Sequence, residues 1–73
     1  MNDKQTALDA CDGAHKDHIA KSASAYFDAF LAAEGQTDAD ALRTQAGERF
    51  KAGLRVYQAA HDSSRALVGQ VFP

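Results

Sequence analysis

The 73-residue sequence lacks most of the features that stabilise or specialise a small protein. It has one cysteine, so an intrachain disulfide is excluded and a reducing, cytoplasmic setting is expected. Tryptophan is absent, and the single proline is Pro73, which leaves long helices uninterrupted. No apolar run is long enough to span a bilayer, and the polar N-terminus lacks the apolar segment of a signal peptide. These absences exclude a disulfide scaffold, a collagen and a transmembrane protein.

Large apolar side chains are also scarce. Alanine supplies 16 of the 33 hydrophobic residues, whereas leucine, isoleucine, valine and phenylalanine together number 13. Because the formal net charge is only −2, this composition predicts an alanine-rich helical protein rather than a disordered chain. A single core in a chain this short supplies about 3–5 kcal/mol, so a second copy or a partner is expected to complete the burial.

One polar segment, residues 34–40, divides the chain nearly in half. Gly35 can adopt the left-handed conformation that ends a helix, and Thr37 can cap the next helix, with Asp40 three residues later in a capping box. Apolar residues recur at three- and four-residue steps on both sides, and the second stripe runs from Leu42 to Val71. The sequence therefore predicts one all-α domain over residues 1–73, an antiparallel helical hairpin with helices at about 6–34 and 38–70 and a turn at 35–37. Whether Gly13 interrupts the first helix is left open.

A turn centred near residue 36 sets opposite each other residues whose numbers add to about 72. In this register Ile19 faces Gly53 and His15 faces Tyr57, and several of the pairs, such as Ile19 with Gly53, set a large side chain against a small one. Six apolar residues fall beside the main stripe and form the expected interaction surface: Phe27, Leu31, Leu54, Val56, Val68 and Phe72. A symmetric dimer that covers them would be a four-helix bundle.

Cys11, His15 and His18 are spaced four and three residues apart, so they project from one side of a helix. The hairpin register brings His61 close to Cys11. Thiolates and imidazoles bind zinc and copper, so a metal-binding or metal-sensing bundle is one alternative function. We favour a small buried thiol beside partly exposed histidines, with no cofactor. Catalysis by Cys11 with a histidine base would need a cleft that a two-helix hairpin rarely offers, so the protein is expected not to be an enzyme.

Charge is distributed unevenly along the chain. Residues 1–40 carry a net charge of −5 and residues 41–73 carry +3, so the two arms attract each other when folded together. Four basic residues of the second arm offer an alternative, RNA-binding face: Arg49, Lys51, Arg55 and Arg65. Because these cations are dispersed and have no stacking aromatic residues beside them, nucleic acid is the less favoured partner.

Two resemblances to known families extend these alternatives. The hairpin plan, with Asp38-Ala39-Asp40 at its turn, resembles the plasmid copy-number RNA-binding protein that forms a four-helix dimer, which implies an RNA-binding regulator. The second arm, with Tyr57, Arg65 and a Val71-Phe72-Pro73 ending, resembles type III secretion needle subunits, which implies a secretion or assembly subunit. The chain lacks the proline-containing turn of the needle subunits, and neither resemblance identifies its family.

The function that the sequence favours is a small, non-enzymatic protein–protein interaction module: a regulator, adaptor or inhibitor. Its expected partners are a second copy of itself and another protein, without a membrane. The thin core and the surplus of apolar residues beside the stripe are the basis of this prediction.

Overall fold

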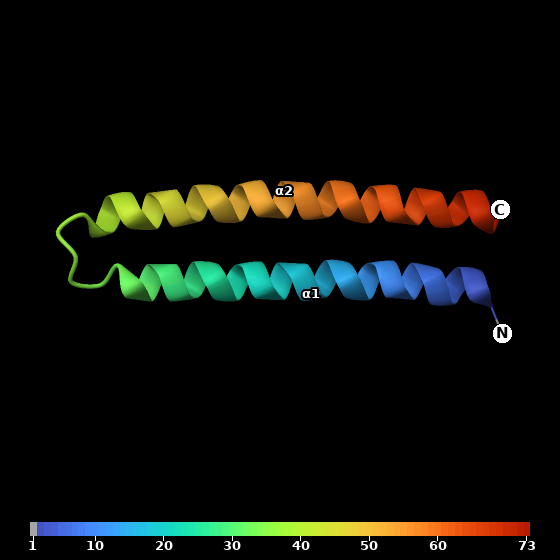
Figure 1. Ribbon diagram of the computed structural model, residues 1–73, viewed down its shortest axis with the longest axis horizontal. Helices are drawn as coiled ribbons and strands as arrows, with labels where there is room; N and C mark the ends of the chain where they lie inside the picture. Colours follow the sequence, from blue (N-terminus) through green and yellow to red (C-terminus); the bar gives the residue numbers. More distant parts are fainter. Residues whose placement is uncertain (1) are drawn as a thin grey trace.

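The computed structural model describes residues 2–73 as two long helices joined by a short turn. Helix α1 spans Asp3–Ala32 and helix α2 spans Ala39–Val71, and they lie side by side with both chain ends at the same end of the molecule (Figure 1). The predicted all-α antiparallel hairpin is therefore confirmed. Its longest dimension is 56 Å, and its radius of gyration of 16.8 Å exceeds the roughly 11 Å of a compact domain of this length. Neither described helix has a stretch long and apolar enough to cross a membrane.

Helix α1 begins a few residues earlier than expected because Asn2 caps it. The Asn2 side-chain oxygen accepts a hydrogen bond of 3.1 Å from the backbone N–H of Gln5. Asp3 in the first turn adds a negative charge near the positive end of the helix dipole. The helix then continues through Gly13 without a break. The sequence contained the signal for this start, since an asparagine followed three residues later by glutamine is a capping pattern.

The turn spans residues 33–38 and differs in part from its prediction. Ala33 keeps helical backbone angles beyond the end of α1, and its N–H donates to the carbonyl oxygen of Ala29 at 3.2 Å. Gly35 has the predicted left-handed conformation, with φ of 80°. The prediction that Thr37 caps α2 was wrong, because Asp38 occupies that position and makes no side-chain capping hydrogen bond.

The predicted register was wrong by about one helical turn. The His15 ring stacks on His61, with centroids 4.2 Å apart, rather than facing the predicted tyrosine. A Cβ added to Gly53 would lie nearest the Ser22 hydroxyl oxygen, at 3.5 Å, and not the predicted Ile19. The numbers of these pairs add to 76 and 75 instead of 72. Each α1 residue therefore lies opposite a residue three or four positions further along α2 than predicted.

The hairpin buries very few of its side chains. Among residues 2–73, only Ala33 and Ala46 are buried, with 1% and 7% exposure, and no large side chain is fully buried. Large apolar side chains are exposed on both helices: Phe27, Phe30, Leu31, Leu42, Val56, Leu67 and Val71. Leu42, Leu67 and Val71 belong to the predicted stripe of α2, yet α1 leaves them exposed. The apolar stripe of α2 is therefore wider than one partner helix covers.

Candidate functional site

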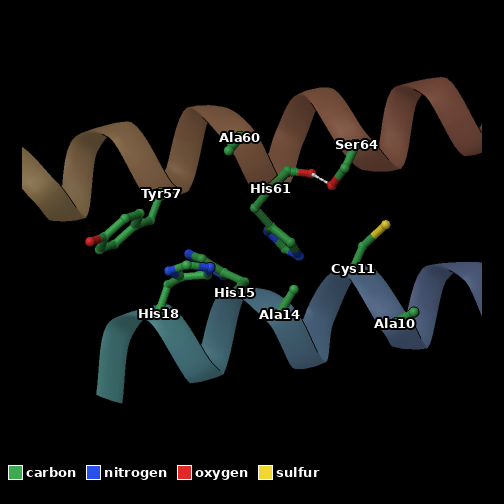
Figure 2. Close-up of a pocket in the computed structure, with 9 residues that line it drawn as sticks. All are labelled: Ala10, Cys11, Ala14, His15, His18, Tyr57, Ala60, His61 and Ser64. Atoms are coloured by element: carbon green, nitrogen blue, oxygen red, sulfur yellow. Dashed lines mark hydrogen bonds between the residues drawn. The ribbon is translucent and has the colours of Figure 1, made fainter. Parts of the chain in front are cut away.

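A cavity of about 430 Å³ opens between the helices in the half of the hairpin near the chain ends. Both helices contribute to its lining: Ala10, Cys11, Ala14, His15, His18, Tyr57, Ala60, His61 and Ser64 (Figure 2). The small alanine side chains leave the space open. Aromatic rings occupy the rest, since His15 stacks on His61 and the ring of His18 lies 5.3 Å from that of Tyr57.

A second, smaller groove of about 150 Å³ opens near the turn. It is lined by Ser22, Ala25, Tyr26, Ala29, Ala46, Arg49 and Phe50. The two grooves are lined on α1 by Ala10 and Ala14 and by Ala25 and Ala29. Their spacing places these four alanines on one side of α1, so both grooves open on the same side of the hairpin. The same spacing places the exposed leucines and Val71 of α2 there. We call this surface the cavity face; its apolar members are Ala10, Ala14, Ala25, Ala29, Leu42, Ala46, Val56, Ala60, Leu67 and Val71, and Lys21 and Arg49 lie among them.

The opposite surface carries side-chain hydrogen bonds and ion pairs. Lys51, Gln58 and Arg65 are seven residues apart, so they form one stripe on the far side of α2 from Ala60 and Leu67. Their carboxylate partners are Glu48, Asp62 and Asp12, respectively, at 3.2, 2.9 and 2.8 Å. We call this surface the charged face. The hairpin is thus apolar and hollowed on one side and polar on the other.

Asp12 joins the two helices at the edge of the charged face. One of its carboxylate oxygens, Oδ1, lies 2.7 Å from Nε2 of His61 and accepts a hydrogen bond of 2.8 Å from Arg65. The hydrogen bond with His61 is the main cause that lowers the pKa of Asp12; partial desolvation opposes it, and the Arg65 guanidinium lowers the pKa further. Asp12 thus holds α1 to α2 while it orients the imidazole that forms one wall of the cavity.

The predicted metal ligands Cys11, His15, His18 and His61 all line the cavity, so the structure does bring them together. Within residues 2–73, however, no group of three or more His, Cys, Asp or Glu side chains is arranged to hold a metal ion. The stacking of His15 on His61 explains this, because ring nitrogens coordinate in the plane of the ring and parallel rings do not converge on one ion. Nε2 of His61 also faces Asp12 and not the Cys11 thiol.

The predicted interaction residues divide into two groups. Phe27, Leu31 and Val56 are exposed, while the other three, Leu54, Val68 and Phe72, are half-buried. Phe27 and Leu31 are four residues apart on α1, near the turn, and point away from α2. They form an apolar pair on the outer side of the hairpin, which we call the outer patch.

The four candidate RNA-binding cations do not share one surface. Lys51 and Arg65 are paired with carboxylates on the charged face, whereas Arg49 lines the small groove on the opposite side. They therefore do not form the partner-free basic surface that RNA binding would require.

Sequence reasoning missed one polar cluster beside the turn. Arg43 lies over the Phe30 ring, 4.0 Å from its centroid, and donates to the carbonyl oxygen of Phe30 at 3.3 Å. It also pairs with Glu34 at 2.9 Å. A correct register would have revealed both the Arg43–Glu34 ion pair and the contact of Asp12 with Arg65, because each joins opposite charges on the two arms.

Comparisons with protein-family models, curated proteins and solved structures found no match for the chain.

Proposed function

We propose that the chain is a non-enzymatic protein-interaction module that acts as a homodimer, and that the dimer binds a second protein through the outer patch. The observation that carries this proposal is the near absence of buried side chains in the single hairpin. Long helices in water derive most of their stability from packing of an apolar face, and one partner helix does not provide it here. In the reducing cytoplasm that we propose as its setting, Cys11 would remain a small packed thiol.

The exposed area supports an obligate dimer. The hairpin exposes 5379 Å², about 1,000 Å² more than a compact protein of 7.8 kDa. That excess is similar to the roughly 800 Å² that each partner buries in a standard protein interface. A compact body of twice the mass would expose about 7,300 Å², so two hairpins forming it would bury about 3,500 Å² in total. This area lies within the range of obligate homodimers.

Phe27 and Leu31 support the second part of the proposal. Phe27 remains 64% exposed and Leu31 57% exposed, and both point away from the cavity face, so a dimer formed on that face leaves them free. Phenylalanine is enriched in protein interfaces, and an exposed apolar patch is typical of an interaction site.

Sedimentation equilibrium and thermal melts followed by circular dichroism test the dimer. We expect twice the chain mass at micromolar concentration, and a melting temperature that falls by about 4–5 °C for each tenfold dilution, since dilution opposes association. A cooperative monomer whose melting temperature is independent of concentration would refute the proposed dimer.

The outer patch is tested by affinity capture from the native host, followed by binding measurements with the purified captured protein. The double variant Phe27→Ser/Leu31→Ser should remain dimeric and lose this binding, because both anchors are removed while the cavity face is intact. Ala20→Ser, on the same outer side of α1, is the matched control and should bind normally. Equal binding by the wild type and the double variant would show that the outer patch is not the binding site.

A further inference from the structure

The cavity face has a large–small asymmetry that selects how a second copy can sit on it. On α1 the apolar members of this face are alanines, with Lys21 between Ala14 and Ala25, and on α2 its exposed members include Leu42, Leu67 and Val71. We propose, building on the dimer proposed above, that two copies pack cavity face to cavity face with their turns at the same end. In this arrangement α2 of each copy lies on α1 of the other.

Two symmetric arrangements bring the cavity faces together. A twofold axis along the hairpin places the turns at the same end and α2 over the partner's α1. A twofold axis across the hairpin places the turns at opposite ends, with α1 over α1 and α2 over α2. In both, alanines let the helices approach closely and the partner covers the open grooves. The two arrangements differ in which side chains meet.

Side-chain size favours the arrangement with the turns at the same end. In the observed register, Leu67 lies level with residues 8–9 of α1 and Leu42 lies level with residue 33. Each leucine would then meet the partner's alanines, near Ala10 and Ala29, as interdigitated packing requires. The alternative arrangement sets alanine against alanine along α1. It also sets Leu42 near the partner's Val71, so large side chains collide while other parts are left empty.

Charge favours the same arrangement. Helix α1 carries a net charge of −2 and helix α2 carries +2, so packing α1 on the partner's α2 joins opposite charges, whereas packing α1 on α1 joins like charges. At the edge of the cavity face, Asp28 of α1 lies level with residues 47–48 of α2. This places Asp28 beside Arg49 of the second copy. The chain therefore has one specific cross-interface ion pair that the other arrangement would not form.

The test uses distance measurements between the turns of the two copies. Gln36 is exposed in the turn, so Gln36→Cys in a Cys11→Ser background gives one spin label per chain with both helices unchanged. Turns at the same end place the labels within about 20 Å of each other, since packed helices lie 8–10 Å apart. Turns at opposite ends place them near the full hairpin length of 56 Å.

A charge-exchange series provides an independent measurement. Asp28→Arg should raise the dimer dissociation constant about fivefold to tenfold because it sets two arginines beside each other in two symmetric places. Adding Arg49→Asp should restore most of the affinity, and Lys16→Glu on the charged face is the control that should have little effect.

The outcomes separate the two proposals. A label distance near 56 Å in a stable dimer, or no rescue by the double exchange, overturns the same-end arrangement and leaves the proposed dimer standing. A monomeric mass for the unlabelled wild type overturns both. A short distance together with the rescue is the result that we expect.

Discussion

Replacing Leu67 by alanine tests the cavity face with a matched control in the same chain. Leu67 is 56% exposed in the hairpin, and Leu31 is 57% exposed, so the two leucines are equally accessible before association. Both lie near the C-terminal end of their helices. They differ in direction, because Leu67 is on the cavity face and Leu31 is on the outer patch.

The magnitude follows from the area that docking would still bury. Fully burying a leucine is worth about 1.5–3 kcal/mol, and slightly more than half of the Leu67 side chain is available for burial. The alanine of the variant retains part of this burial free energy, so Leu67→Ala should weaken association by about 1 kcal/mol per chain and about 2 kcal/mol per dimer. The dimer dissociation constant should therefore rise roughly 30-fold.

Sedimentation equilibrium of Leu67→Ala, Leu31→Ala and the wild type measures this difference. We expect Leu31→Ala to associate like the wild type within about 0.5 kcal/mol, since surface substitutions away from an interface have small effects. Equal losses in the two variants would indicate a general effect on the helices. A loss confined to Leu31→Ala would place the dimer interface on the outer patch and refute the assignment of the cavity face.

Three further predictions concern the hairpin itself. Gly13 has open space around it, so Gly13→Ala should stabilise the protein by about 1 kcal/mol per chain in urea denaturation. Gly35→Ala should destabilise it by a similar amount because Gly35 has a positive φ. Destabilisation by Gly13→Ala would contradict a continuous α1. Because the pKa of Asp12 is lowered in the folded state, its contribution to stability is present above the ordinary aspartate pKa and is lost as the pH falls below about 4. Asp12→Asn should therefore lose less stability than the wild type between pH 5 and 2, while Asp9→Asn should behave like the wild type; parallel acid titrations of Asp12→Asn and the wild type would contradict this. Cys11→Ala should cost about 1 kcal/mol with or without added zinc, and stoichiometric zinc lost only in that variant would contradict the absence of a metal site.

The sequence was sufficient to predict the hairpin because local signals determine it. Apolar residues at helical spacing and Gly35 at the midpoint specify two helices and a stop between them, and the structure has both. The register depends on a feature with no such signal. Both helices end within a few residues of their predicted bounds, yet the pairs across the hairpin are displaced by three or four residues. Helical periodicity shows which side of each helix packs but not how far one helix is shifted along the other.

The contacts of the candidate site could not be predicted because they depend on that register. A displacement of about one helical turn replaces the expected His15–Tyr57 pair by the His15–His61 stack. The same displacement brings Asp12 to Arg65. Periodicity also does not distinguish the part of a wide apolar stripe that packs within the hairpin from the part left for another chain.

The division between the two faces also determines how loss of the interface would be observed. The interhelical polar contacts at Asp12 and Arg43 hold the arms in register but are partly open to solvent, where such contacts contribute little stability. Only two small residues are buried in the described chain, so in the proposed dimer most of the folding free energy would come from the surfaces that association covers. Folding and dimerisation are then one equilibrium, and a variant that weakens the cavity face loses helix content on dilution. A variant of the outer patch keeps its helix content and loses only the partner, which allows circular dichroism to separate the two surfaces.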